Sequence, residues 1–196
     1  MLPVQPYITD TFVSYKGDII ITRLSLAIRL KDDYTGEEPI GYIEVMYGEE
    51  NQKAIKNPGG YYIFTDMPAG NNTVSVKSKI YYSRELTVNP SLLDPKNPVL
   101  EILLKPLPSY PFPANATLAR GLLSNPDMNL TANVNIKAVK PEIETISDAN
   151  GEFVLYFKDV KNKKITIEFK KDGKSKTVKT NLDEGKTVSL GKIAFP

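Results

Sequence analysis

The chain has 196 residues, with 25 Lys and Arg against 23 Asp and Glu, and therefore a net charge of +2. It contains no cysteine and no histidine, which excludes disulfides, thiolate or imidazole metal ligands, and nucleophile systems with a histidine base. Hydrophobic residues make up 41% and charged residues 24%, a composition typical of a folded globular protein.

Short runs rich in Val, Ile, Tyr, Phe and Thr recur along the chain, separated by its 15 prolines and 12 glycines. Apolar and polar residues alternate within these runs, which places one set of side chains in a core and the other in water. We therefore expect an all-β protein, with a helix possible only near residues 90–94. The N-terminal runs, residues 11–15 and 18–30, predict at least one extra strand in the first half.

A turn motif occurs twice. Asn57 is followed three positions later by Gly60 and, two positions further, by an aromatic residue; Asp148, Gly151 and Phe153 have the same spacing. An Asn or Asp with a glycine three positions on suits a tight turn in which the glycine supplies a positive φ before the return strand. Both motifs therefore predict structural turns between paired strands.

The repeat extends away from both turns as matching apolar runs: 43–45 with 134–136, 74–76 with 165–167, 86–88 with 178–180, and 100–104 with 188–190. Each half thus supplies about six or seven short strands, the pattern of a β-sandwich. Prolines at positions 106, 108, 111 and 113 predict a stiff, extended connection. We predict a first sandwich at residues 1–105 with the extra N-terminal strand, a linker at 106–113, and a second sandwich at 114–196.

The second half resembles a known family. Thr145, Ser147, Asp148, Gly151 and Phe153 are similar to the T-x-T-D-x-x-G-x-F hairpin of the carboxypeptidase regulatory-like family, a transthyretin-like (prealbumin-like) sandwich. The resemblance covers residues 118–195 well and 26–104 loosely. It implies two tandem Greek-key β-sandwich domains of about seven strands each, and it implies no activity.

Two acidic groups could offer oxygen ligands to calcium. One contains Asp148, Asn150 and Glu152, but apolar residues at the later ligand positions favour a hairpin turn. The other contains Asp32 and Asp33, with Glu37 and Glu38 after the turn at Gly36. We interpret it as a solvated hairpin loop, with calcium as the alternative. No metal or other cofactor is predicted.

No catalytic residues are predicted either. Paired carboxylates could support hydrolysis without histidine, but the glutamates mostly alternate with apolar residues on the expected strands, as on an exposed sheet face. We therefore predict that the protein is not an enzyme.

Tyrosine is distributed unevenly, because Tyr156 is the only one of the 11 tyrosines in the predicted second sandwich, residues 114–196. The adjacent pairs Tyr61 and Tyr62, and Tyr81 and Tyr82, would each place one ring inward and one outward on a strand. Outward rings could stack on sugars or anchor a protein partner. These four tyrosines are the predicted ligand or partner contacts.

Residues 158–192 hold eleven lysines against five acidic residues, a net charge of +6. A basic surface could attract an anionic polymer, but these lysines are interleaved over several expected strands, and edge lysines that prevent aggregation explain them better. No nucleic-acid partner is predicted. No signal peptide is visible and no run approaches the roughly 18 apolar residues of a membrane span, so we expect a soluble protein, extracytoplasmic if a leader was removed.

These observations favour a structural, adhesion or assembly module that acts through protein–protein contacts of sheet edges and loops. A protein partner or self-association is expected. The long apolar run at residues 19–30, interpreted as an unpaired edge outside the repeat, is the predicted contact. The other interpretation of this run is that Arg23 and Arg29 protect the edge from pairing. The alternative is a carbohydrate-binding protein that uses exposed tyrosines of the first domain.

Overall fold

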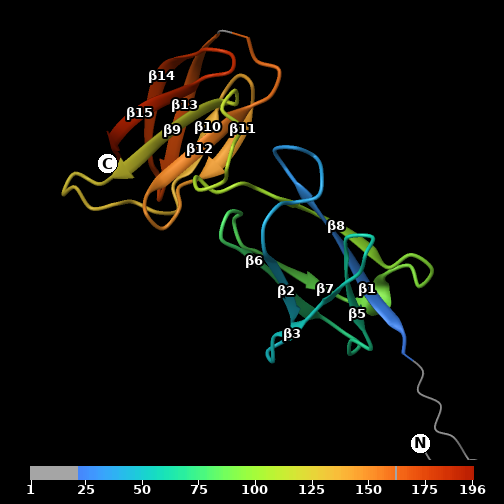
Figure 1. Cartoon of the computed structure of the whole chain (residues 1–196). Coiled ribbons are helices and arrows are strands. Elements are labelled where there is room, and N and C mark those ends of the chain that lie inside the picture. Colours follow the sequence, from blue (N-terminus) through green and yellow to red (C-terminus); the bar gives the residue numbers. More distant parts are fainter. Residues whose placement is uncertain (1–21, 162) are drawn as a thin grey trace, which may run out of the picture.

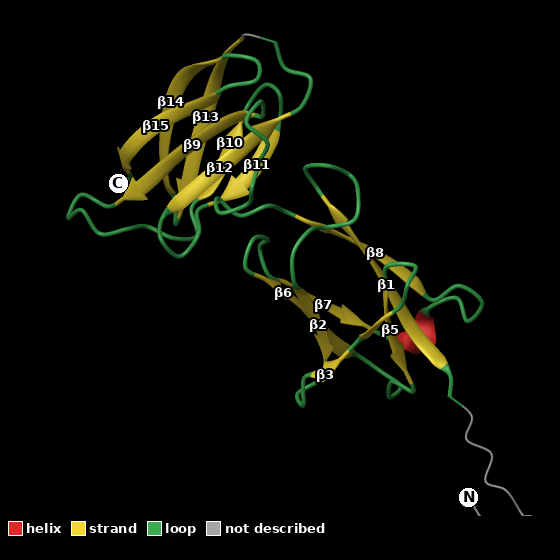
Figure 2. Ribbon diagram, viewed as in Figure 1, coloured by secondary structure: helices red, strands yellow, loops and turns green. Residues whose placement is uncertain are grey.

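The computed structural model describes residues 22–161 and 163–196, and it consists of two β-sandwiches in tandem (Figure 1). Its one helical element is a short 3-10 turn, η1 (Pro90–Leu92), coloured red in Figure 2. This turn lies where the sequence allowed a helix. The all-β, tandem-sandwich prediction is confirmed. Within the described residues, no helix is long and apolar enough to span a membrane.

Within residues 22–105, the first sandwich contains eight strands in two sheets. One sheet has the order β4 (Ile55–Lys56), β5 (Tyr61–Thr65), β1 (Leu24–Asp32) and β8 (Val99–Leu104). The other has the order β3 (Gln52–Lys53), β2 (Ile43–Tyr47), β6 (Asn72–Ser78) and β7 (Arg84–Val88). The chain passes repeatedly from one sheet to the other, so strands distant in sequence become neighbours.

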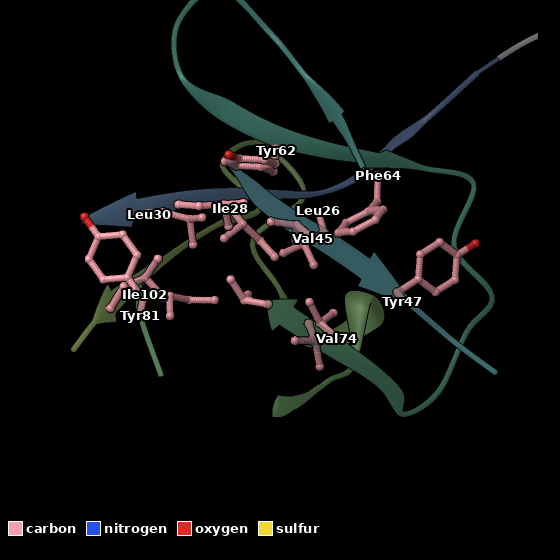
Figure 3. Close-up of a cluster of buried hydrophobic side chains, with 14 of the residues drawn as sticks. Leu26, Ile28, Leu30, Val45, Tyr47, Tyr62, Phe64, Val74, Tyr81 and Ile102 are labelled. Carbon is pink, nitrogen blue, oxygen red and sulfur yellow. The ribbon is translucent and has the colours of Figure 1, made fainter. Parts of the chain in front are cut away.

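Alternation along the strands builds the first core (Figure 3). Leu26, Ile28 and Leu30 of β1 are buried, whereas Arg29 between them is exposed. They pack against residues of the opposite sheet such as Val45, with which they form one apolar cluster. Period-two alternation in the sequence thus specifies which face of each strand enters the core.

The second sandwich repeats this arrangement with seven strands. One sheet has the order β12 (Glu152–Phe157), β9 (Thr117–Ser124) and β15 (Thr187–Ala194). The other has the order β11 (Ile143–Ile146), β10 (Asn135–Ala138), β13 (Lys163–Lys171) and β14 (Lys174–Leu182). Its core contains Phe153 and Phe169, whose ring centroids are 5.5 Å apart in an edge-to-face arrangement.

The two sandwiches share one topology. β1 lies between an antiparallel neighbour, β5, and a parallel neighbour, β8; β9 lies in the same way between β12 and β15. β1 therefore has a counterpart in the second sandwich and is hydrogen-bonded on both sides. The prediction that residues 19–30 form an unpaired edge outside the repeat is wrong for residues 24–30. Residues 19–21, and the expected strand at residues 11–15, lie outside the described part of the chain.

The two turn motifs have the same hydrogen bonds. The Asn57 side chain accepts from the amide four positions on at 2.9 Å, and Asp148 accepts from its equivalent at 2.9 Å. Gly60 and Gly151 each donate their amide to the carbonyl of the Asn or Asp at 3.0 Å, with φ of +81° and +72°. Glycine is favoured at these positions because other residues rarely adopt such a φ.

Candidate functional site

A buried carboxylate lies where β1 ends. Asp32 is 0% exposed, and its Oδ2 accepts hydrogen bonds from the hydroxyls of Tyr81 at 2.7 Å and Tyr110 at 2.6 Å. Its Oδ1 accepts from the backbone amides of Tyr34 at 2.7 Å and Thr35 at 3.2 Å. Four donors compensate for removal of the carboxylate from water. The interpretation of this acidic group as a solvated loop is therefore wrong for Asp32.

The proline-rich segment is attached to the first sandwich by these contacts. Tyr110 lies within it and is only 5% exposed. Pro106 forms an isolated bridge with Tyr81, and the Leu107 amide donates to the carbonyl of Ile80 at 2.8 Å. The segment therefore packs along the first sandwich as it leaves β8.

Aromatic rings continue from this segment into the second sandwich. Tyr34 lies edge-on to Phe112 at 5.0 Å and to Tyr156 at 5.6 Å between ring centroids. Tyr156 belongs to β12, and together with Tyr34 and Phe112 it packs against the buried side chains of Leu118 and Val154. A single apolar cluster is thus covered by Tyr34 of the first sandwich, Phe112 of the proline-rich segment and Tyr156 of the second sandwich.

Polar contacts accompany these rings. The Tyr156 hydroxyl donates to the carboxylate of Asp33, and the Lys158 ammonium donates to the carbonyl of Asp33 at 2.8 Å. Arg120 of β9 donates to the carbonyl of Pro108 at 2.8 Å, and its guanidinium lies 5.4 Å from the centroid of the Phe112 ring. Cation–π contacts of this kind are stronger where water is excluded.

A second group of contacts lies at the edge of β11. The Tyr82 hydroxyl donates to the carbonyl of Ile146, and the Lys105 ammonium donates to the carbonyl of Glu144 at 3.3 Å. The Tyr82 amide also donates to the carbonyl of Lys105 at 2.9 Å, which holds the two donors side by side. Residues of the first sandwich therefore occupy backbone acceptors that a sheet edge would otherwise present.

Burial raises the pKa of the tyrosine hydroxyls at this junction. Desolvation, followed by the hydrogen bond to Asp32, raises the pKa of Tyr110 to about 12. Desolvation also raises the pKa of Tyr82 to about 12. Burial and then the hydrogen bond to Asp33 raise the pKa of Tyr156. These hydroxyls therefore remain protonated donors at neutral pH, as their acceptors require.

A cleft of about 520 Å³ opens beside the β11 contacts, between the two sandwiches. Two of its carboxylates are engaged in ion pairs: Glu144 with Lys137 at 3.0 Å and Glu168 with Lys170 at 2.7 Å. Both lysines line the same cleft, so its two carboxylates are each paired with a cation at the cleft surface.

The four tyrosines that were predicted to contact a ligand or partner differ in how exposed they are. Tyr62 and Tyr81 are buried, at 8% and 1% exposed, whereas Tyr61 and Tyr82 are partly exposed, so each pair has one inward and one outward ring as predicted. A surface contact is therefore wrong for the two inward rings. Tyr82 contributes to the junction. Among the outward rings, Tyr61 keeps an exposed portion, so a ligand or partner contact there stays a prediction.

The side chain of Asp148 accepts hydrogen bonds within its own turn. Its Oδ1 accepts from the amides of Asn150 at 2.8 Å and Glu152 at 2.9 Å, as in a hairpin turn. In residues 22–161 and 163–196, no three Asp or Glu side chains are grouped so that they could hold a metal ion.

The sequence analysis placed Asp32 and Asp33 in a solvated acidic loop and assigned no contact to Tyr34, Tyr110 or Tyr156, so it missed the junction. One signal was present, because Tyr110 is the tyrosine within the proline-rich segment and Tyr156 is the only one that follows it. An amphipathic side chain at each of these places is suited to an interface with apolar packing and a polar acceptor.

Comparison with known proteins identifies no family. No family model matches the chain, and no curated protein matches it. Among solved structures, the chain is similar to the Bacillus anthracis TIE protein (14% identity over 86% of this chain and 33% of that one, TM-score 0.31) and to a Streptococcal ancillary pilin (11%, 88% and 62%, TM-score 0.31). It is also similar to the shaft pilin SpaA from Lactobacillus rhamnosus GG (9%, 89% and 97%, TM-score 0.30). The chain spans less than two thirds of the first two proteins, and similarity at this level assigns no function.

Proposed function

We propose that this protein is a non-enzymatic structural module in which two β-sandwich domains, residues 1–105 and 114–196, are held by the segment 106–113 as one rigid unit. It acts in adhesion or assembly through protein–protein contacts of its sheet edges and loops. The turn at Asp148 and the shared topology of the sandwiches support a place among carboxypeptidase regulatory-like, transthyretin-like domains.

The observation that carries this proposal is the junction. Neighbouring domains in one chain move relative to each other by default unless their interface is large and apolar. Here, an apolar cluster is shared by Tyr34, Phe112 and Tyr156. The second sandwich is also joined to residues before position 113 by hydrogen bonds from Tyr82, Lys105, Arg120, Tyr156 and Lys158. A satisfied polar network around an apolar contact favours one geometry over its alternatives.

The chemistry of the junction supports a mechanical role. The polar groups at the junction hydrogen-bond to one another, so their role is to fix the geometry of the junction rather than to react with a substrate. Asp32 is the clearest case, since its carboxylate accepts from both Tyr81 and Tyr110 inside the first core and from two backbone amides of its own turn. A spacer or assembly subunit requires its two domains to keep one relative orientation, because its function is to transmit position and load between its ends.

Amide NMR relaxation tests the proposal. In the unsubstituted protein, the two sandwiches should tumble with one common rotational correlation time. The double variant Phe112→Ala/Tyr156→Ala should give each sandwich a shorter time of its own, while amide chemical shifts within each core stay unchanged. Tyr42→Ala is the matched control, since Tyr42 is 75% exposed and lies away from the junction. Independent tumbling of the unsubstituted protein would contradict a rigid unit.

A further inference from the structure

One tyrosine ring is held upright on the surface of the first sandwich. Tyr42, just before β2, is 75% exposed and is the most exposed tyrosine in the described part of the chain. Its hydroxyl donates to Oε1 of Glu44 at 3.1 Å, and the same oxygen accepts from the Lys53 ammonium at 2.9 Å. An exposed ring fixed in one orientation loses less entropy when a ligand packs on it.

Two hollows meet at this ring. One, of about 560 Å³, lies toward β6 and is lined by Lys79 and Ile80 among others. The other, of about 280 Å³, lies toward β3 and is lined by Lys53 and Tyr62 among others. Tyr42 lines both. Since β2 lies between β6 and β3 in its sheet, the ring stands between two recesses.

The larger hollow is kept open by a glycine. Gly41 lines it with a φ of +77°, and a Cβ atom at this position would lie 3.3 Å from Cδ1 of Ile80. The hollow therefore combines two apolar groups, the Ile80 side chain and the ring of Tyr42, while Gly41 adds no side chain to fill it.

Cations exceed carboxylates around the ring. The two hollows are lined by four lysines and one glutamate, namely Lys53, Lys56, Lys77, Lys79 and Glu44. Ion pairs at 2.9 and 2.7 Å occupy Lys53, with Glu44, and Lys56, with Glu38. Among the described residues, Lys77 and Lys79 form no ion pair. Two exposed ammonium groups beside the larger hollow are therefore available to an anionic ligand.

We propose that Tyr42 and its two hollows bind acidic sugar units of a polysaccharide. A sugar ring that carries a carboxylate has a face of C–H groups, an anion and several hydroxyls. The C–H face packs on the tyrosine ring, whose face carries partial negative charge. The carboxylate pairs with Lys77 or Lys79, and the remaining lone pairs of Glu44 accept from sugar hydroxyls. The second hollow receives the neighbouring sugar.

A single-stranded nucleic acid fits this surface less well. It stacks successive bases on several aromatic side chains along a basic groove, whereas Tyr42 is the one exposed aromatic ring among the described residues. Its phosphates would also meet Glu44 as a like charge, whereas sugar hydroxyls donate to this carboxylate. The site belongs to the first sandwich alone, so it stands or fails independently of the rigid junction.

Amide NMR titration with tetragalacturonate tests the ligand class. Resonances of residues 41–44 and 77–80 should shift to saturation, and added salt should weaken the binding because exposed charges are screened. Neutral maltotetraose should bind about tenfold more weakly, since it has no anion for the lysines. Shifts confined to other residues, or equal binding of maltotetraose, would overturn the proposal. Oligothymidylate that binds as tightly as tetragalacturonate would overturn it in favour of a general polyanion surface.

Substitutions test the residues. Tyr42→Ala should weaken tetragalacturonate binding by about tenfold or more, because the ring supplies the packing surface, and Tyr42→Phe should lose less, because it keeps the ring. Lys77→Gln should weaken binding several-fold. Its matched control is Lys174→Gln, which removes the same charge from an exposed position on β14 and should have no effect. Unchanged melting temperatures show that the variants are folded. Equal losses from Lys77→Gln and Lys174→Gln, or full binding by Tyr42→Ala, would contradict this site.

Discussion

The hydroxyl of Tyr156, on β12 of the second sandwich, donates a hydrogen bond to the carboxylate of Asp33, 123 positions earlier at the end of β1. The preceding residue, Asp32, points the other way and is bonded to Tyr81 and Tyr110 inside the first core. Two adjacent carboxylates therefore connect the interior of one sandwich to the surface of the other.

Removing one donor from Asp32 should destabilise the first sandwich. Tyr110→Phe keeps the ring but leaves Oδ2 of the buried carboxylate with Tyr81 as its remaining hydroxyl donor. We expect a loss of about 1–3 kcal/mol in the free energy of unfolding, measured by denaturant titration. Tyr42→Phe is the control, because the hydroxyl of Tyr42 bonds to Glu44 at an exposed site. Equal effects of the two substitutions would contradict a stabilising role for the Asp32 cluster.

Stability should decrease in alkaline solution. The pKa of Tyr110 rises from 10.0 to about 12 on folding, so the folded state holds its proton more tightly than the unfolded state. The stability linked to this proton is fully present below pH 10 and is lost as the pH rises from about 10 to 12, by up to about 1.4 kcal/mol per pH unit. Denaturant unfolding across this range measures the slope. Tyr110→Phe should reduce it, and an unchanged slope would exclude this tyrosine as the cause.

The turn at Gly151 should tolerate no Cβ atom. Gly151 has φ +72°, and a Cβ would lie 2.5 Å from the Leu123 carbonyl oxygen. Gly173 has φ +76° and open space around it, so Gly173→Ala isolates the backbone strain, about 1 kcal/mol. Gly151→Ala should cost about 1–3 kcal/mol more, because the backbone must also shift, and Gly151→Val should be at least as harmful. Similar melting temperatures for the two alanine variants would argue against the close approach.

The second sandwich should fold without the first. A fragment of residues 114–196 contains the complete second cluster of buried residues, so it should be rich in β-structure and melt cooperatively by circular dichroism. Its melting temperature should be lower than that of the same sandwich in the full chain, because Leu118 and Val154 lose their cover from Tyr34 and Phe112. An unfolded fragment would instead indicate that the two halves depend on one core.

The sequence predicts those features that depend on local pattern. The turns at Asn57 and Asp148 are specified by residues within five positions, and strand faces by period-two alternation, so both can be read from short windows. The Asp32 cluster has no such signature. Its hydroxyl donors, Tyr81 and Tyr110, lie 49 and 78 positions away, and an acidic pair before a glycine turn has the same appearance whether it is exposed or buried.

The interior position of β1 in its sheet could not be predicted from the sequence either. Edge and central strands differ in backbone pairing, whereas alternation of side chains reports only which face is buried. The run that contains Leu26 and Ile28 is therefore equally compatible with an edge strand and with a central strand. Its parallel partner, β8, is the last strand of the first sandwich and begins at Val99. No short window of the sequence therefore contains both strands.

A distance measurement between two spin labels tests the rigid junction most directly. Lys53→Cys and Lys174→Cys would place one label on an exposed residue of each sandwich, and dilution with unlabelled protein would remove contributions from self-association. We predict one narrow distance distribution, which Phe112→Ala/Tyr156→Ala broadens. A broad distribution in the protein with its junction intact would contradict the account of two sandwiches fixed as one unit.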